Sequence, residues 1–344
     1  RHTRYPLVTG VQTCALPILV DRPQDLMSDL LDEKTVVPYL VKRGIINEPV
    51  EVEVLTGGVS NVVLGIKSRE RDLVLKQALP QLKVKQEWLA DQRRAIVEAD
   101  AMRLFHSLTP DAVPEIIDND PEEFTVTMAR LPRECVNWKE EMLAHRANPI
   151  IGSRLGHILA TWHNYGASNQ SMRDKFMEDS LFEQLRLNPF YRAVAKLNPD
   201  LTVIPKLILE NEGHKTTLVH GDFSPKNIMV TPDFHPIILD FEVEHTGNPV
   251  FDLAFVTAHL VCKYIKTRNP DVAQTAHNFF VNYKEHSELP ISSSVAHHIA
   301  LIALARVEGV SPVNYLEPSE QAEVQRLTKK ILRQESAEVS ELFQ

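Results

Sequence analysis

The sequence predicts an α+β protein with two lobes, a small antiparallel β-rich lobe followed by a larger, mostly helical one. Three observations lead to this class. The 344 residues exceed the ~150 residues of an average domain, so two compact parts are expected. Residues 50–77 hold three short strand patterns separated by turn signals. Beyond residue 148, apolar side chains recur mainly at helical spacing.

The strands of the first lobe follow a short helix. Residues 35–43 have a helical pattern that Gly44 would close at its carboxyl end. Residues 50–55 alternate Val and Glu at the period of a strand, and residues 61–67 and 72–77 continue this character. Three strands joined by tight turns predict an antiparallel sheet.

A helix and a further strand complete the first lobe. Residues 92–107 keep one face apolar, which predicts a helix, and residues 124–128 are rich in β-forming side chains. Leu131-Pro132 then interrupts the pattern. We therefore expect one lobe over residues 27–131 and the other over residues 132–344.

The second lobe is predicted to be mainly helical. Residues 149–165 place apolar side chains at i, i+4 and i+7. Residues 168–215 form a polar insertion with short helical pieces. Two short strands are predicted at residues 228–230 and 237–239, and helices fill the remainder.

The first 26 residues do not fit this pattern. They begin at Arg1 and precede the first methionine, Met27. Gln12 and Pro17 interrupt the apolar run, and no clear cleavage site follows, which argues against a signal peptide. The stretch resembles a translated sequencing adapter; the alternative is a disordered natural extension. We expect residues 1–26 to be a non-native or disordered leader.

Composition excludes several classes of protein. The 37 Lys and Arg against 46 Asp and Glu give a formal charge of −9, which argues against a general binder of nucleic acid or anionic membranes. The three cysteines are far apart and offer neither a disulfide framework nor zinc spacing, so we expect a cytoplasmic location. No stretch approaches the ~18 uninterrupted apolar residues of a membrane span.

One segment carries the chemistry. Four residues separate Asp222 from Asn227, in the pattern Asp222-x4-Asn227, and Asp240 follows the apolar run of residues 237–239. A carboxylate beside an acceptor hydroxyl can orient it and take its proton. An amide oxygen and a second carboxylate suit Mg²⁺, which prefers oxygen ligands. A loop followed by a hairpin can bring these three side chains together.

The same segment resembles the aminoglycoside phosphotransferase and choline kinase-like superfamily, the small-molecule branch of the protein-kinase-like fold. That branch has His-Gly-Asp where protein kinases have His-Arg-Asp, and this chain has His220-Gly221-Asp222. The resemblance covers roughly residues 50–315. It implies a two-lobed protein-kinase-like fold, with ATP and Mg²⁺ as cofactors and a small-molecule hydroxyl as acceptor.

The resemblance also implies roles for individual residues of the segment. Asp222 matches the catalytic base, and Asn227 and Asp240 match the metal ligands. Glu242 stands where protein kinases have Gly. It resembles the Glu of the Asp-x-Glu motif in methylthioribose kinases, which also faces the metal.

Two further residues match structural supports of the loop. Asp252, in Gly247-Asn248-Pro249-x2-Asp252, resembles the carboxylate that braces the catalytic loop. His220 precedes the matched base by two residues, so we expect it to brace the loop rather than to transfer protons.

The first lobe is expected to supply the nucleotide site. Lys76 matches the Lys that contacts the α- and β-phosphates, and Glu98 on the following helix would be its partner. Alone, Lys76 could be an edge residue of a strand and Glu98 a solvated helix charge. The resemblance implies two further groups of contacts: Gly57, Gly58, Ser60 and Asn61 toward the phosphates, and Met128, Ala129 and Leu131 toward adenine.

A narrower resemblance links the chain to methylthioribose kinases. Both carry a Lys-Gln-Ala-x-Pro run, here at residues 76–80, followed by a loop with a Trp. Trp88 would lie in that loop, although it could equally be a packing residue. Those kinases use paired arginines late in the chain, where this chain has only Arg306, and their catalytic loop lacks the Asn that this chain keeps at Asn227.

Several interpretations stay open. The leading one is an ATP- and Mg²⁺-dependent phosphotransferase acting on a small-molecule hydroxyl. The alternatives are a methylthioribose-like sugar kinase and an inactive nucleotide-binding regulator. The scattered histidines do not favour zinc chemistry. We expect no nucleic-acid or membrane partner, and the sequence leaves open the acceptor, the nucleotide preference and the oligomeric state.

Overall fold

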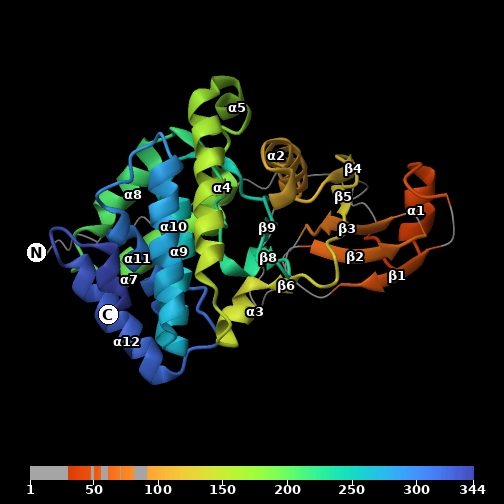
Figure 1. The fold of residues 1–344 in the computed structure, drawn as a ribbon. Coiled ribbons are helices and arrows are strands. Elements are labelled where there is room, and N and C mark those ends of the chain that lie inside the picture. The colour runs from red at the N-terminus through yellow and green to blue at the C-terminus, as the bar shows by residue number, and fades with distance from the viewer. Residues whose placement is uncertain (1–29, 48–49, 56–60, 70, 81–90) are drawn as a thin grey trace, which may run out of the picture. The chain divides into compact units, whose positions relative to one another are not determined.

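The computed structural model describes most of the chain (Figure 1). The chain divides into two units, residues 1–30 and 31–344. The predicted leader lies outside the described residues. The described ranges are 30–47, 50–55, 61–69, 71–80 and 91–344.

A five-stranded antiparallel sheet forms the first part of this unit, in the order β1-β2-β3-β5-β4. The predicted α+β class is confirmed. Helix α1 (Val36–Lys42) packs on the sheet, and Gly44, with φ +72°, closes it as the pattern predicted. The strands are β1 (Glu51–Val54), β2 (Asn61–Lys67), β3 (Asp72–Ala78), β4 (Ile116–Asp120) and β5 (Thr125–Ala129).

Strand β4 was not predicted, because three of its five residues are acidic or amide side chains that disfavour strands. The structure shows how they are used. Arg43 Nη1 lies 2.7 Å from Asp120 Oδ2, and Arg43 Nη2 lies 2.9 Å from Asp118 Oδ1. Two carboxylates of an edge strand are thus bound by the residue that follows α1. The ion pairs of Arg43 with Asp118 and Asp120 join distant parts of the chain, so no local sequence pattern predicts them.

Helix α2 (Arg94–Leu108) connects the sheet to the helical part of the unit. Its buried apolar side chains, among them Phe105, belong to the large hydrophobic core. The ring of Phe105 lies 4.5 Å from the ring of Trp162 and 5.6 Å from that of Phe241. Trp162 is a residue of α4, and Phe241 follows Asp240. The aromatic contacts therefore fix α2 against the segment that carries the predicted metal ligands.

The remainder is largely helical, with short strands around the loops. Strands β6, β8 and β9 form one small sheet, and β7 pairs with β10. The helices are α3 (Trp138–Leu143), α4 (Pro149–Ser168), α5 (Gln170–Lys175), α6 (Ser180–Phe182), α7 (Ala193–Leu197), α8 (Ile204–Gly213), α9 (Val250–Thr267), α10 (Pro270–His286), α11 (Val295–Glu308) and α12 (Pro318–Leu332). The strands are β6 (Val136–Asn137), β7 (Thr217–Val219), β8 (Ile228–Val230), β9 (Pro236–Ile238) and β10 (His245–Gly247).

A π-helix spans Glu183–Arg192 within the predicted polar insertion. Pro189 lies inside it, and proline has no N–H for a regular α-helical bond. Such wide turns occur often at functional sites. This one positions Arg186, whose Nε lies 2.8 Å from the carbonyl oxygen of Gly221.

Helices α4 and α10 run side by side (Figure 1). Each begins with an Asn-Pro pair, and the Asn side chains of Asn148 and Asn269 accept bonds from backbone N–H groups of the first turn. Gly152 and Gly156 allow the two backbones to approach closely. A Cβ at Gly156 would stand 2.4 Å from the carbonyl oxygen of Phe279. None of the described helices has the length and apolarity needed to cross a membrane.

The close approach predicts a specific cost for adding one methyl group. Gly156→Ala must push α10 away from α4, so we expect the free energy of unfolding to fall by about 1–3 kcal/mol. Gly213→Ala is the matched control, because a Cβ there meets no atom within 4 Å. The free energy of unfolding of Gly213→Ala should equal that of the wild type or exceed it by up to about 1 kcal/mol. Chemical denaturation of the two variants measures the difference, and equal stabilities would contradict this packing argument.

Candidate active site

The loop between β7 and β8 is held by a carboxylate from α9. Asp252 is fully buried, and its two oxygens accept bonds from the backbone N–H groups of His220 (2.8 Å) and Gly221 (2.9 Å). Gly221 has φ +72°, and a Cβ on it would lie 2.9 Å from the carbonyl oxygen of Val243. Both the conformation and the space require glycine. The His-Gly-Asp sequence thus has a steric cause.

His220 joins this loop to the strand that ends before Asp240. Its Nδ1 accepts a bond from the N–H of Asp222 at 3.1 Å, and its Nε2 lies 3.2 Å from the carbonyl oxygen of Leu239. This pair of contacts requires the neutral tautomer with the proton on Nε2. Burial lowers the pKa of His220, which favours the same neutral form.

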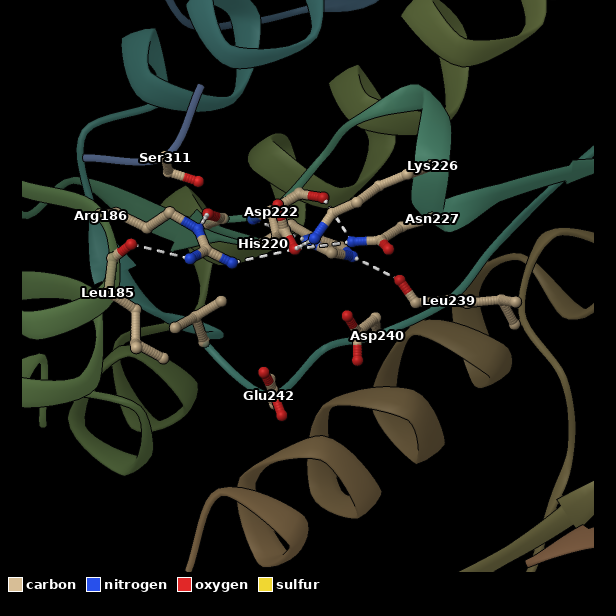
Figure 2. A network of polar contacts seen from close by, with 12 residues as sticks. Leu185, Arg186, His220, Asp222, Lys226, Asn227, Leu239, Asp240, Glu242 and Ser311 are labelled. Carbon is tan, nitrogen blue, oxygen red and sulfur yellow. Dashed lines mark hydrogen bonds and ion pairs between the residues drawn. The ribbon is translucent and has the colours of Figure 1, made fainter. Parts of the chain in front are cut away.

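Asp222 is buried among three donors (Figure 2). Its Oδ2 lies 2.9 Å from Arg186 Nη2, 2.9 Å from Lys226 Nζ and 2.8 Å from Asn227 Nδ2. Burial by itself would raise the pKa of Asp222, but Arg186 and Lys226 outweigh it and hold the pKa below its ordinary value. The carboxylate is therefore ionised at neutral pH. In the described part of the chain no group donates to its Oδ1, which is left to receive a hydrogen bond from a bound molecule.

An ion-pair chain connects the sheet, α2 and the loop after β9. Lys76 Nζ, on β3, lies 2.5 Å from Glu98 Oε1 and 3.0 Å from Asp240 Oδ1. Burial opposes the charge of Lys76, but the two carboxylates outweigh burial and raise its pKa. Burial raises the pKa of Glu98, whereas for Asp240 the attraction of Lys76 outweighs burial and lowers the pKa. The Lys is thus held charged at the meeting point of three elements.

Asp240 and Glu242 turn toward the same region, facing α2 (Figure 2). The backbone of Asp240 has φ +71°, which is strained for a residue other than Gly. Such strain concentrates at functional sites. Glu242 Oε2 lies 3.3 Å from Arg94 Nε but makes no hydrogen bond among the described residues. Burial, reinforced by Asp240, raises the pKa of Glu242 to about 7. An ionised Glu242 therefore needs more positive charge than the protein provides.

These oxygens suit a hard cation. Asn227, Asp240 and Glu242 offer an amide and two carboxylates, which is the donor set that Mg²⁺ prefers. Glu242 Oε2 is buried beside Arg94 without a hydrogen bond, and a bound cation would complete its contacts. No group of three or more His, Cys, Asp or Glu side chains is arranged to hold a metal within the described ranges. The fit therefore depends on the Asn amide as the third protein ligand.

The remaining predicted residues fall at several places. Met128 and Ala129 end β5, Leu131 follows it, and Asn61 begins β2 with its side chain buried. Arg306 lies in α11, with its guanidinium 5.5 Å from the ring of Phe190. Four predicted residues lie outside the described residues: Gly57, Gly58, Ser60 and Trp88.

Two residues of the site were missed by the sequence analysis. Lys226 follows Asp222 by four residues, and this spacing was a visible signal for the ion pair. Arg186 is 36 residues away from Asp222, in the polar insertion, and no motif marks it. Only the π-helix places its guanidinium beside the carboxylate.

Together, the two-lobed fold and the site define a kinase-like protein that brings a lysine and several carboxylates to one place. The sequence model of the phosphotransferase enzyme family matches residues 51–285, more than half of the chain. The chain belongs to this family. The expected membership in the aminoglycoside phosphotransferase family is confirmed at that level.

Curated relatives include methylthioribose kinases. The enzyme of Bacillus cereus strain AH820 is 29% identical over 264 residues, which cover 67% of this chain and 66% of that protein. The enzyme of Geobacillus kaustophilus is 26% identical over 266 residues, with the same coverage. The match thus spans slightly less than two thirds of the length of these relatives.

Solved structures share the fold. The macrolide 2'-phosphotransferase of Brachybacterium faecium has a TM-score of 0.53 at 17% identity, covering 92% of this chain and 100% of that one. An amicoumacin kinase, solved in complex with AMP-PNP, Ca²⁺ and the compound Ami, has a TM-score of 0.52 at 14% identity, covering 87% of this chain and 94% of that one. These likenesses confirm the kinase-like fold.

The contacts of Asp252 predict a loss of stability when its carboxylate is replaced by an amide. In Asp252→Asn an N–H₂ group must face a backbone N–H, so the free energy of unfolding should fall by about 1–3 kcal/mol. Asp271→Asn is the matched control, since Asp271 is exposed on α10; we expect a change within about 0.5 kcal/mol. Thermal and urea melts of both variants test this. An Asp252→Asn protein as stable as the control would show that the loop does not depend on the carboxylate.

Proposed function

We propose that the protein transfers the γ-phosphoryl group of ATP to a hydroxyl of a small molecule, with Mg²⁺ as the metal. The observation that carries this proposal is the arrangement of Asp222 and the Lys76–Asp240 ion pair on facing sides of one site. A lone carboxylate could serve many reactions. Asp222 together with Lys76 and with oxygen ligands for a hard cation fits phosphoryl transfer. In that reaction, positioning of the reactants and neutralisation of charge provide most of the rate enhancement.

Asp222 would act on the acceptor. Its ionised carboxylate can accept a hydrogen bond from the acceptor hydroxyl through Oδ1, while three donors hold Oδ2. The hydroxyl oxygen attacks phosphorus in line, its proton passes to Asp222, and the bond from phosphorus to the ADP oxygen breaks. Arg186 and Lys226 keep the pKa of Asp222 low. They therefore favour orientation of the hydroxyl, with the proton moving late in the transfer.

The opposite side of the site would hold the nucleotide. Lys76 donates hydrogen bonds to Glu98 and Asp240, and its third N–H can bind a phosphate oxygen. Asn227, Asp240 and Glu242 would hold Mg²⁺, which offsets negative charge on the phosphates when it is bound. Adenine would contact the backbone around Met128, Ala129 and Leu131. The amicoumacin kinase that shares this fold was solved with AMP-PNP and Ca²⁺, which supports a nucleotide and a divalent cation here.

A second candidate is a methylthioribose-like sugar kinase. The curated relatives at 24–29% identity carry that name, which is the observation that favours it. Against it, the chain has the single Arg306 where those kinases are expected to have paired arginines, and it keeps Asn227. Both candidates predict the same transfer chemistry and differ only in the acceptor.

The role of Asp222 predicts a large kinetic effect. Asp222→Asn should lower kcat by on the order of 10²–10⁴-fold, because the amide cannot take the hydroxyl proton. ATP consumption over a panel of hydroxyl acceptors provides the measurement. Asp271→Asn is the control and should retain full activity. An Asp222→Asn protein that turns over at the wild-type rate would refute the assignment. Nucleotide binding by the wild type with no transfer to any acceptor would instead favour an inactive regulator.

The role of Lys76 predicts an effect on the nucleotide. Lys76→Met removes a phosphate contact, so we expect the Kd for ATP to rise about 10-fold or more. The variant also leaves Glu98 buried without its cation, which should lower the melting temperature. Lys67→Met is the matched control, since Lys67 is exposed on the neighbouring strand β2. Calorimetric titration with a non-hydrolysable ATP analogue tests both, and equal affinities would exclude Lys76 from the nucleotide site.

A further inference from the structure

Next to Asp222 lies a group of buried and half-buried polar side chains that the proposed transfer chemistry does not use. We call it the α9–α11 cluster: His259 and Lys263 on α9, Arg306 on α11 and Tyr315 in the segment that follows. Lys263 Nζ lies 5.3 Å from the centre of the Tyr315 ring. His259 and Lys263 are one helical turn apart, so they lie on the same face of α9.

Aromatic contacts connect this cluster to the catalytic carboxylate. The guanidinium of Arg306 lies over the ring of Phe190 at 5.5 Å, and this ring lies 5.2 Å from that of Phe255. Arg186, which binds Asp222, lies over the ring of Phe255 at 5.8 Å. Ser311, which accepts a hydrogen bond from Arg306 Nη1, appears beside Arg186 and Asp222 in Figure 2. The cluster therefore adjoins the acceptor side of Asp222.

The cations of the cluster lack anionic partners. Lys263 is 1% exposed, and in the described part of the chain its Nζ makes one hydrogen bond, to the carbonyl oxygen of His259 at 3.5 Å, besides its contact with the Tyr315 ring. Arg306 Nε and the Tyr315 hydroxyl are buried and make no hydrogen bond to any described residue. No carboxylate among the described residues forms a salt bridge with Lys263 or Arg306. Burial, with the nearby charge of Arg306, lowers the pKa of Lys263 to about 7.

Three other cations with little exposure, all among the described residues, are paired with carboxylates. Lys76 has Glu98 and Asp240, Arg94 lies beside Glu242, and Arg186 binds Asp222. A buried cation without a counter-charge is unfavourable, since the protein does not replace the water it has lost. Two such cations with an unpartnered phenol, next to the position of the acceptor hydroxyl, form a site that a bound anion would complete.

We propose that the acceptor carries an anionic group, a carboxylate or a phosphate, in addition to its hydroxyl. Lys263 and Arg306 bind this group, and the Tyr315 hydroxyl donates a hydrogen bond to it. The hydroxyl to be phosphorylated then faces Asp222. This inference rests on the proposed function and specifies its substrate class. Polycationic acceptors such as aminoglycosides are disfavoured, because they would face Lys263 and Arg306 without neutralising either.

Anion binding provides a test that does not require turnover. Inorganic phosphate and acetate are titrated into the full-length protein, with and without a saturating non-hydrolysable ATP analogue, and binding is followed by calorimetry and by melting temperature. At least one anion should bind to the nucleotide-saturated wild type. In Lys263→Met and Arg306→Met its Kd should rise about 10- to 100-fold. Lys266→Met is the control on the same helix, since Lys266 is paired with Glu320, and it should bind like the wild type.

Stability separates a ligand site from a structural role. If the cations serve to bind a ligand, Lys263→Met should melt at or above the wild-type temperature without anion, because it removes an unpaired buried charge. If the lysine held the fold together, the variant would melt lower. Anion binding that is unchanged in both variants, or absent from the wild type, overturns the proposal.

Turnover on matched acceptors then distinguishes the anionic groups. Glycerate is compared with glycerol and with the cationic serinol, and ribose 5-phosphate is compared with ribose. We expect kcat/KM for the preferred anionic acceptor to exceed that of its neutral counterpart by about 100-fold, and Lys263→Met to abolish this preference. A preference for the neutral or cationic members contradicts the inference. Failure to bind nucleotide would instead count against the proposed function, and the anion titration without nucleotide would still decide the present inference.

Discussion

The contact between Lys76 on the sheet and Asp240 on the loop after β9 is the interaction on which the proposed site depends. At 3.0 Å it joins two segments that are 164 residues apart in the chain, and Glu98 orients the same ammonium from α2. Pairing offsets the desolvation cost of buried charges, so the two carboxylates and the lysine hold each other in place. The aromatic contacts of Phe105 with Trp162 and Phe241 stabilise this arrangement without adding charge.

Charge is distributed unequally on the two sides of Asp222. On the side of Asp240 and Glu242 there are more carboxylate oxygens than the lysine and arginine satisfy, and a cation would complete them. On the side of Lys263 and Arg306 there are cations without carboxylates. A metal-bound nucleotide on one side and an anionic acceptor on the other would correct both imbalances. Asp222, held by cations from both the loop and the π-helix, lies between them.

Much of the fold could be predicted because its causes are local. Residues 61–67 and 72–77 alternate or cluster apolar side chains, and they form β2 and β3 almost as predicted. The helix predicted from residue 149 begins there because Asn148 caps it. Strand β4 could not be predicted, since its acidic residues are stabilised by Arg43 from a distant segment. Arg186 was missed for the same reason, because its contact with Asp222 depends on a π-helix.

The sequence by itself determined the proposed catalytic segment, the family resemblance and most helices and strands. These features depend on local sequence, such as the four residues between Asp222 and Asn227. The turn between His220 and Asp222 likewise accepts only glycine at its centre. The tertiary structure decided which charges meet. The pairing of Lys76 with Asp240, the place of Arg186, and the lack of anions around Lys263 and Arg306 all join segments far apart in the chain. Electrostatic interactions depend on distance in space and on burial, and neither quantity is encoded in any local pattern of residues.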